Sequence, residues 1–309
     1  MDQVSLVYQI NRSVFFNQLL NSKGWKKGEK DEKGTFGMWF PHNFETRECT
    51  IQLYPKHETD IFDDKITFYQ FLKRKHLLNN IPQTYLTIND VVGESDDSPS
   101  RLWFLKHRNG TEGKQVWAYR KRQDLLKFFT KPNIINDYIV QKEVEDLFLM
   151  FGHKLSLRIF ALIHNKKLYV YRDFIVKIHP KLYNTTDERK DVHITAIAGS
   201  GALPIRGTLW TEYNNVYPVI KKVIREVVPT FFDVLNDDDR DQYSLIGIDF
   251  LIDNKLKPWI IEFNSYPSLW DDTYQASMYI KKELINDMYG LLIDPALGLP
   301  QSLGNFEKV

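Results

Sequence analysis

Short runs of alternating apolar and polar residues mark the strands of this chain. A strand presents successive side chains to opposite faces, so strict alternation predicts a half-buried strand. The clearest run is Lys154–Ala161, in which Lys154, Ser156 and Arg158 share one face and apolar side chains share the other. Further strands are predicted at residues 50–54, 81–85, 102–106, 115–119, 138–144 and 168–176.

Apolar residues at three- and four-residue spacing mark the helices. Residues 13–20 begin with Ser13, whose hydroxyl is suited to cap a first helical turn. Residues 216–235 have the same spacing and contain Pro229, which interrupts a helix. Helices are also predicted at 64–80, 123–130 and 269–287, whereas residues 179–195 are predicted to form a loop and the tail after residue 288 to be extended.

Length and composition are those of an ordinary globular protein with two or three modest domains. The chain has 309 residues, of which 43% are apolar and 26% charged. Strands mixed with helices predict an α/β (α+β) fold. Acidic residues at 60–64 suggest one boundary, and we expect an N-terminal α/β domain at 1–63, a central domain at 64–144 and a C-terminal domain at 145–309.

Charge and cysteine content narrow the class of protein. The net charge of +1 gives no general bias toward nucleic acid or an anionic membrane, and we expect neither as a partner. Basic residues at 23–33 and 73–75 suit either an acidic peptide or simple solvation. The single cysteine, Cys49, excludes an internal disulfide and a cysteine-based zinc site. No apolar run of about 18 residues and no secretory leader is evident, so we expect a cytoplasmic protein.

Three oxygen donors lie in a predicted hairpin that joins residues 247–253 to residues 258–265. Glu262 and Asn264 are two residues apart on one strand, so their side chains face the same way. If Asp249 lies opposite them, the three oxygens converge and suit Mg²⁺ whose remaining ligands are substrate phosphates. An ordinary hairpin whose polar residues face solvent is the alternative, and the hairpin alone does not decide between them.

The strand that ends at Lys106 leads into a loop that contains glycines and then into a second strand. Gly110 and Gly113 allow backbone N–H groups to approach an anion, and Lys106 adds positive charge. The loop is not a Walker P-loop, because no Gly-Lys-Ser/Thr ending and no helix follow it. An ordinary hairpin with a basic turn fits the same residues.

The strand at 138–144 passes from apolar to polar residues. Such a segment suits a nucleotide hinge, in which the backbone of Gln141 to Val144 reads an adenine edge and Lys142 reaches a phosphate. A solvated strand end is the alternative. On the next strand, two cations and a hydroxyl in a row suit a carboxylate or phosphate surface.

Taken in this order, the elements resemble the ATP-grasp superfamily and, within it, the tubulin–tyrosine ligase-like family. The resemblance covers roughly residues 64–270 and is most specific at its C-terminal end. The motifs that resemble the family are Lys106 with its glycine loop, Tyr138-Ile139-Val140-Gln141-Lys142, Gly152-His153-Lys154-x-x-x-Arg158, and Gly247-Ile248-Asp249-Phe250 with Ile261-Glu262-Phe263-Asn264.

The resemblance implies a ligase with ATP and Mg²⁺ as cofactors. The carboxylate of a protein or peptide acceptor, tubulin being the family's best-known kind, attacks the γ-phosphate. The amine of a free amino acid then displaces phosphate from the acyl-phosphate to give an amide. The implied roles are Mg²⁺ binding by Asp249, Glu262 and Asn264, phosphate binding by Lys106 and Lys142, and binding of the acyl-phosphate or an amino-acid carboxylate by Lys154, Arg158 and Lys177.

Three positions depart from the family pattern. Ser156 stands where the family usually has an acidic residue, Lys177 where it has an arginine, and Ala196 where it has an asparagine. Lysine cannot reproduce a bidentate arginine contact, and serine removes a charge. Two alternatives therefore stay open, a nucleotide-binding module without activity and an ATP-grasp ligase that acts on a small metabolite.

Overall fold

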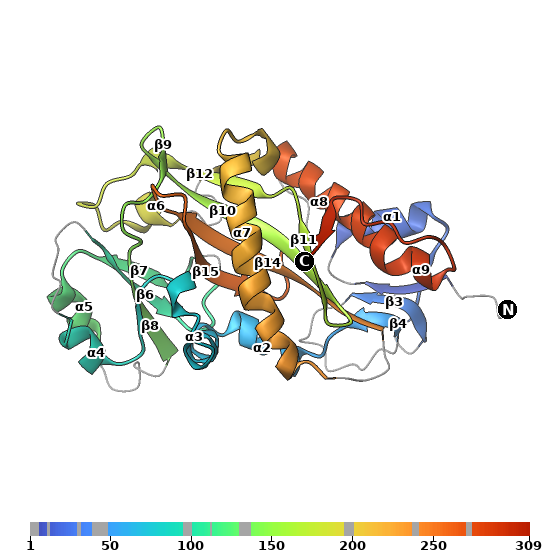
Figure 1. Cartoon of the computed structure of the whole chain (residues 1–309), viewed down its shortest axis with the longest axis horizontal. Coiled ribbons are helices and arrows are strands. Elements are labelled where there is room, and N and C mark those ends of the chain that lie inside the picture. Colours follow the sequence, from blue (N-terminus) through green and yellow to red (C-terminus); the bar gives the residue numbers. More distant parts are fainter. Residues whose placement is uncertain are drawn as a thin grey trace.

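The computed structural model covers the whole chain and places most of it in two sheets with helices around them (Figure 1). It describes residues 6–10, 13–29, 32–38, 49–94, 101–111, 113–129, 137–194, 201–236, 241–269 and 274–309. Ala196, one of the three departures from the family pattern, lies outside these residues. The mixture of strands and helices confirms the predicted α/β fold class.

Within the described residues, twelve strands form one mixed sheet through the middle of the molecule (Figure 1). Its central strands, β10 and β14, run antiparallel, and β14 also pairs in parallel with β4 from the N-terminal part of the chain. The strands of this sheet are β1 Val7–Ile10, β2 Lys26–Lys27, β3 Gly34–Met38, β4 Cys49–Leu53, β9 Leu149–Met150, β10 His153–His164, β11 Lys167–Tyr171, β12 Ile175–Leu182, β13 Leu203–Arg206, β14 Asp241–Ile252, β15 Pro258–Asn264 and β16 Phe306–Lys308.

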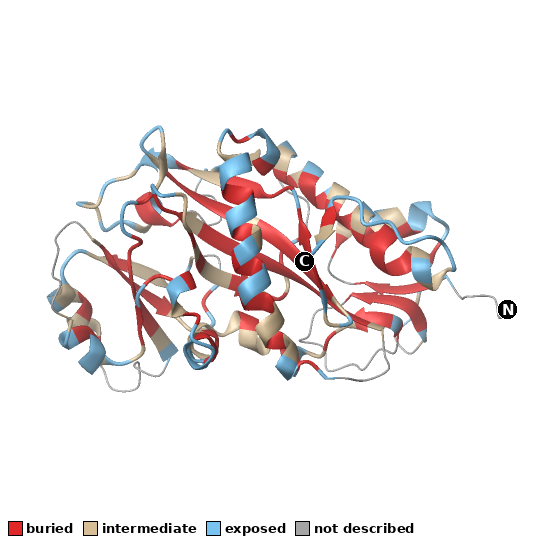
Figure 2. Cartoon of the chain, in the orientation of Figure 1, coloured by how far each residue is buried: buried red, intermediate tan, exposed pale blue. Residues whose placement is uncertain are grey.

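Helices cover both faces of the large sheet (Figure 1). Helix α7 packs with α2 and α3 on one face, and α1 and α8 lie on the other. Buried residues follow the strands and the inward sides of these helices (Figure 2). The helical segments are α1 Val14–Ser22, α2 Lys56–Asp63, α3 Lys65–Arg74, η1 Leu78–Asn80, α6 Lys190–His193, η3 Gly207–Leu209, α7 Tyr213–Val227, η4 Val228–Val234, α8 Gln275–Met288, the π-helical η5 Tyr289–Ile293 and α9 Asp294–Ala296.

Alternation along β10 decides which side chains reach the site. Leu155, Leu157 and Ile159 enter the core beneath α7, as predicted. The opposite face is polar from residue 154 to residue 158, and it then continues as Phe160 and Leu162 in the second core beneath α1 and α8. One face of a single strand therefore serves first as a polar surface and then as core.

A second, four-stranded antiparallel sheet stands beside the large one, in the order β5-β8-β6-β7. Trp103, Leu105 and Val140 on one of its faces pack against two short helices. Phe104 lies opposite Gln141 on the other face, which points to the large sheet. These elements are β5 Thr84–Tyr85, α4 Ile88–Val92, β6 Trp103–His107, β7 Val116–Tyr119, α5 Arg122–Phe128 and β8 Tyr138–Lys142.

Two local predictions about helix ends are confirmed. The Ser13 hydroxyl accepts a hydrogen bond from the Phe16 N–H at 3.1 Å, as an N-cap does. Helix α7 ends at Val227, and the chain continues as a 3₁₀ segment that contains Pro229. A proline lacks the N–H that an α-helix needs there, which is why the helix stops.

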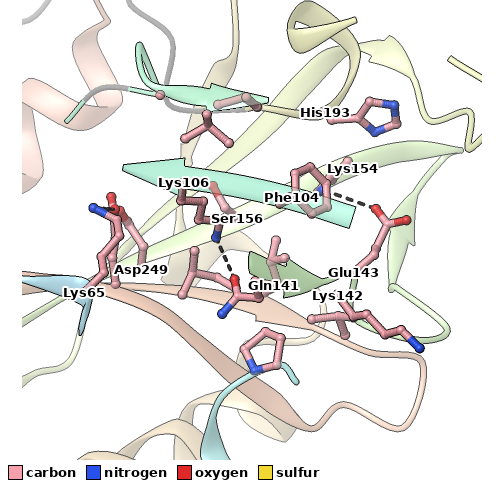
Figure 3. A pocket seen from close by; sticks show the side chains of 18 of the residues that line it. Lys65, Phe104, Lys106, Gln141, Lys142, Glu143, Lys154, Ser156, His193 and Asp249 are labelled. Atoms are coloured by element: carbon pink, nitrogen blue, oxygen red, sulfur yellow. Dashed lines mark hydrogen bonds and ion pairs between the residues drawn. The ribbon is translucent and has the colours of Figure 1, made fainter. Parts of the chain in front are cut away.

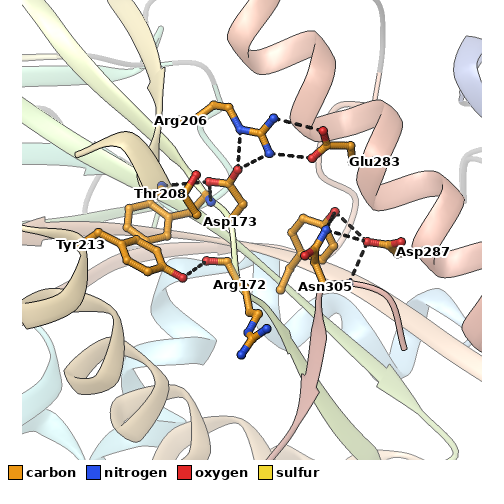
Figure 4. Close-up of polar contacts among 10 residues, drawn as sticks. Arg172, Asp173, Arg206, Thr208, Tyr213, Glu283, Asp287 and Asn305 are labelled. Atoms are coloured by element: carbon orange, nitrogen blue, oxygen red, sulfur yellow. Dashed lines mark hydrogen bonds and ion pairs between the residues drawn. The ribbon is translucent and has the colours of Figure 1, made fainter. Parts of the chain in front are cut away.

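The predicted strand at 168–176 is wrong, because the structure has two strands, β11 and β12, separated by residues 172–174. The Asp173 carboxylate accepts hydrogen bonds from the N–H groups of Phe174 at 2.9 Å and Thr208 at 3.2 Å. It also pairs with Arg206, which binds Glu283 of α8 (Figure 4). A buried carboxylate that caps a turn in this way redirects the chain, and alternation alone does not reveal it.

Two segments that were predicted to lack regular structure are partly regular. Strand β12 continues to Leu182 and α6 follows within the predicted loop. The predicted extended tail forms η5 and α9 and returns as β16, which pairs with β11. Asp287 anchors this return by accepting hydrogen bonds from the Tyr171 hydroxyl and the Asn305 N–H, both at 2.9 Å (Figure 4). None of the helices described here is long and apolar enough to cross a membrane.

Candidate functional site

A cavity lies between the polar face of the small sheet and the large sheet (Figure 3). It contains about 830 Å³ of space, part of it open to solvent. Lys106 and Gln141 come from the small sheet, and Lys154, Ser156 and Asp249 come from the large one. The cavity thus collects residues that are far apart in the sequence.

Most of the residues predicted for the site line this one cavity. Arg158 and Asn264 do not line it, but Arg158 bonds to Asp249 and Asn264 follows Glu262 on the same strand. The predicted residues that line it are Lys106, Gly110, Gly113, Gln141, Lys142, Val144, Lys154, Lys177, Asp249 and Glu262.

The predicted metal ligands lie on the β14–β15 hairpin. Asp249 pairs directly with Glu262 across the two strands, and Gly247 pairs with Asn264. The Asn264 amide donates to the Gly247 carbonyl at 3.4 Å. This register is the one that the convergence of the three oxygen donors requires.

Arg158 holds the Asp249 carboxylate with two parallel hydrogen bonds. Its Nε and Nη2 atoms donate to the two carboxylate oxygens at 2.6 Å each, and the Lys177 ammonium lies 3.9 Å from the same carboxylate. Burial disfavours all three charges, but Asp249 attracts Arg158 strongly enough to raise the pKa of the guanidinium. Arg158 and Lys177 in turn lower the pKa of Asp249 against its burial, whereas burial lowers the pKa of Lys177.

Lys65, at the start of α3, joins the β14–β15 hairpin to the glycine-containing loop between β6 and β7, which we call the lid. Its ammonium lies 3.5 Å from Glu262 Oε2 and donates to the Gly110 carbonyl at 2.8 Å. The preceding residue, Asp64, caps α3 and accepts a hydrogen bond from Arg108 Nε at 2.8 Å. No spacing in the sequence signals this role of Lys65, because it depends on where α3 begins relative to two distant strands.

Lys106 is buried at the middle of the cavity and donates to Gln141 Oε1 at 2.6 Å. Burial lowers the pKa of Lys106 to about 7; the nearby Lys65 and Lys154 add to this, and Glu262 opposes it. An ammonium group with this pKa becomes fully charged only when an anion arrives. Lys106 is therefore suited to a phosphate that is present for part of a reaction cycle.

Glu143, Lys154 and His193 line the other side of the cavity, away from Lys65 and Asp249 (Figure 3). Each is at most 4% exposed, and the Lys154 ammonium lies 3.6 Å from Glu143 Oε1. His193 Nε2 faces the Asp187 carbonyl, which can only accept, so Nε2 carries the proton and Nδ1 keeps a lone pair. Burial and the charge of Lys154 lower the pKa of His193, so the ring is neutral.

Two buried acceptors on this side have no hydrogen-bond partner among the residues that the structure describes. They are Glu143 Oε1 and His193 Nδ1. Buried polar atoms are nearly always hydrogen-bonded, and an exception points to a missing water or ligand. A ligand that donates hydrogen bonds would satisfy both atoms.

The structure does not bring the Lys142 ammonium together with that of Lys106. Lys142 follows Gln141 on β8 and therefore points to the opposite face of the small sheet, away from Lys106 (Figure 3). Its Nζ lies 4.9 Å from the centre of the Trp103 ring and 3.7 Å from a Glu94 oxygen. A phosphate contact by Lys142 stays a prediction that this placement does not support.

The donor set fits a magnesium ion held by few protein oxygens. The described residues include no group of three or more His, Cys, Asp or Glu side chains that could hold a metal. Two opposed carboxylates with one amide leave coordination positions for phosphate oxygens and water, the arrangement that Mg²⁺ prefers. The surrounding cations, Lys65, Lys106, Lys154, Lys177 and Arg158, outnumber Glu143, Asp249 and Glu262, so a polyanion is accommodated.

Sequence reasoning missed several cavity residues besides Lys65. Glu143 lies within the predicted hinge strand, two residues after Gln141, and Leu251 lies two residues after Asp249 on the same face, so period-two spacing could have found both. Phe104 lies two residues before Lys106 on β6, so the same spacing could have found it too, whereas no local spacing signals the others. The remaining missed residues are Pro82, Phe104, Val116, His193, Ile194 and Ile261.

Comparisons with known proteins show similarity over most of the chain. The model of the tubulin-tyrosine ligase family matches residues 38–198 and 208–296. A probable alpha-tubulin polyglutamylase of Tetrahymena thermophila is 23% identical over 82% of this chain and 71% of its own length. A probable tubulin polyglutamylase of Caenorhabditis elegans is 25% identical over 94% of this chain and 81% of its own length, and a tubulin glycylase of Drosophila melanogaster is 24% identical over 68% and 24%. The chain belongs to the tubulin-tyrosine ligase family.

Proposed function

We propose that this protein is an ATP- and Mg²⁺-dependent ligase that joins an amino acid to a carboxylate of tubulin through an acyl-phosphate. The observation that carries the proposal is the cavity, in which Asp249 and Glu262 stand opposite each other beside an excess of buried cations. The names of the relatives support tubulin as the acceptor, because they are tubulin polyglutamylases and a tubulin glycylase. They also favour a protein acceptor over a small metabolite.

The length of the cavity suits a nucleoside triphosphate. Lys154 lines one end, and Arg158, which holds the cavity residue Asp249 at the other, is four residues further along β10, about 13 Å at a strand rise of about 3.3 Å per residue. The phosphates would lie at the Arg158 end, where the carboxylates and most of the cations are. The base would lie at the Lys154 end, where His193 Nδ1 lacks a hydrogen-bond partner among the described residues and could accept from its amino group, beside Glu143 Oε1, which lies 3.6 Å from the Lys154 ammonium.

Asp249, Glu262 and Asn264 would hold the metal. Held there, Mg²⁺ would supply positive charge against the negative charge of the phosphates. Lys106, which Gln141 positions, lies beside the phosphate path and can take up a proton as the charge arrives. Arg158 and Lys177 would face the transferred phosphoryl group, where two cations stabilise its equatorial oxygens.

The chemistry needs no nucleophilic side chain of the enzyme. An acceptor carboxylate oxygen attacks the γ-phosphorus, and the bond to the ADP oxygen breaks. The amino-acid amine then attacks the acyl carbon, phosphate leaves with its bonding electrons, and the amine loses a proton to solvent. The chain contributes the positions of the two reactants and a site of fixed positive charge.

The test is an incubation of the purified chain with ATP, Mg²⁺ and tubulin, together with glutamate, glycine or tyrosine in separate reactions. We expect intact-mass spectrometry to show tubulin heavier by whole amino-acid residues and an equal amount of ADP released. Nucleotide binding without any mass increase would favour a module that has lost activity. The departures from the family pattern at Lys177 and Ser156 would then be the first candidates for the cause.

A further inference from the structure

The carboxylate that is best placed to bind the metal is already engaged by the chain itself. Both oxygens of Asp249 accept hydrogen bonds from Arg158, at 2.6 Å each. The side chains are 15% and 9% exposed, so water competes little for either group. Arg158 therefore occupies the space and the charge position in which a cation would bind.

Gly247 leaves the room that the Arg158 side chain needs to reach Asp249. A Cβ atom at residue 247 would lie 3.1 Å from Arg158 Cδ and 2.9 Å from Pro267. The missing side chain thus leaves the channel along β14 through which the arginine reaches Asp249. The other cations nearby are less suited to this role, since Lys177 is 3.9 Å from Asp249 and Lys65 makes its shorter contact to the lid.

Arg158 uses one lone pair on each Asp249 oxygen, so a metal that binds through both of these positions requires Arg158 to move. A buried guanidinium without a partner costs several kcal/mol, so Arg158 does not leave for an apolar environment. It needs another anion within the cavity. Phosphate oxygens form the same bidentate contact with arginine as a carboxylate does, so a nucleotide can take over Arg158.

We propose that Arg158 holds the place of the metal in the empty protein, and that a nucleotide admits the metal by drawing Arg158 away from Asp249. The nucleotide part of this inference rests on the proposed function, whereas the blocking of Asp249 does not. Metal and nucleotide then bind interdependently: each is weak alone, and each strengthens the other by the same factor.

The test measures Mn²⁺ binding by electron paramagnetic resonance, with Mn²⁺ alone and with Mn²⁺ plus a non-hydrolysable ATP analogue. In the unmodified protein we expect Mn²⁺ alone to bind at least about tenfold more weakly than Mn²⁺ with the analogue, within the usual range of coupling between two sites. In Arg158→Gln, Asp249 is released, so Mn²⁺ alone should bind about tenfold more tightly than in the unmodified protein, and the coupling to nucleotide should fall.

Two further variants show where the added metal binds. The double variant Arg158→Gln with Asp249→Asn should lose the gain, because the released carboxylate is gone. Arg172→Gln removes an exposed arginine that pairs with Glu307, and it should leave Mn²⁺ binding unchanged. Arg158→Lys keeps the charge but not the paired hydrogen bonds, so an intermediate gain is expected if the glutamine variant does not fold.

Equal Mn²⁺ affinity in the unmodified protein with and without the analogue would overturn the proposal. So would an Arg158→Gln protein that is folded and binds Mn²⁺ alone no better than before. If the analogue does not bind at all, the proposed function fails, but the gain of Mn²⁺ binding in Arg158→Gln still tests whether Arg158 blocks Asp249.

Discussion

The two ends of the cavity each hold a buried ion pair, but they differ in how completely their buried acceptors are hydrogen-bonded. At the hairpin end, Asp249 is held by Arg158, and Glu262 lies 3.5 Å from the Lys65 ammonium. At the hinge end, Glu143 Oε1 and His193 Nδ1 are buried without a hydrogen-bond partner in the part of the chain that the structure describes. At the first end, Arg158 must be exchanged before both Asp249 oxygens can bind a metal. At the second, His193 Nδ1 is available to a donor, and Glu143 Oε1 is held by the longer 3.6 Å ion pair with Lys154.

This difference indicates how the ends would share the work of binding. Exchange of buried ion pairs couples metal binding to phosphate binding, because a cation that leaves one carboxylate must find another anion. Acceptors that lack a hydrogen bond instead discriminate between ligands, because a ligand without a donor leaves them unsatisfied at a cost of about 1–3 kcal/mol. We expect the hairpin end to control when the metal and phosphates bind, and the hinge end to control which base binds.

The largest effect should come from breaking the hairpin end at Glu262. Glu262→Gln keeps the shape but removes the charge that would hold the metal, so we expect turnover with ATP and Mg²⁺ to fall by more than about 100-fold, the scale of losing one charge-stabilising contact in a transition state. ADP release and tubulin mass measure it. The matched control is Glu226→Gln, which changes an exposed glutamate on α7. Full activity of Glu262→Gln would show that Glu262 does not hold the metal.

The pH dependence of nucleotide binding should show whether Lys106, which lies between the two ends, faces the phosphates. In the empty cavity its pKa is about 7, so it is mostly neutral above that pH. A phosphate favours the charged form and raises this pKa, so binding takes up a proton and weakens as pH rises. We expect affinity to fall by up to about tenfold per pH unit between about pH 7.5 and 9.

Calorimetry in buffers of different ionisation enthalpy measures both the affinity and the proton uptake. Lys106→Arg is charged at every pH in this range, so its affinity should not change with pH even if it is weaker overall. An unmodified protein whose affinity is constant from about pH 7.5 to 9 would show that Lys106 does not face the phosphates.

A substitution at His193 tests whether the hinge end, near Glu143, selects the base. If its Nδ1 accepts a hydrogen bond from the amino group of adenine, the unmodified protein should prefer ATP over inosine triphosphate, which has an oxygen in that position. We expect His193→Leu to reduce this preference about fivefold, the value of roughly one hydrogen bond. Equilibrium binding of the two nucleotides measures the ratio, and the exposed His57→Leu serves as control. A ratio that His193→Leu leaves unchanged would mean that the base is read elsewhere.

Lys65 should give the smallest effect, because its shorter contact is with the Gly110 carbonyl of the lid and its contact with Glu262 is longer. Lys65→Met removes the hydrogen bond to the Gly110 carbonyl, so the lid should open more often in the empty protein. We expect tryptic cleavage at Lys114 to accelerate about threefold, consistent with one hydrogen bond of modest net strength. Lys73→Met changes an exposed lysine on the same helix and should leave the rate unchanged. Unchanged cleavage in Lys65→Met would show that other contacts hold the lid.

Predictions from the sequence succeeded where local spacing decides the outcome. Alternation placed Lys154, Ser156 and Arg158 on one face of β10, and the predicted hairpin is present, with Asp249 opposite Glu262 as the convergence of the oxygen donors required. Both follow from the period of two along a strand. Predictions failed at Asp173, where a side chain caps a turn, and in the tail, where pairing with β11 creates a strand.

The sequence by itself determined the fold class, the order of the site elements and the candidate metal ligands. These depend on side-chain chemistry and on periods of a few residues. Only the tertiary structure decided that Arg158 closes on Asp249, that Lys65 joins the lid to Glu262, and that burial lowers the pKa of Lys106 to about 7. Those properties depend on distance and burial between strands that are far apart in the chain, and neither quantity is present in local spacing.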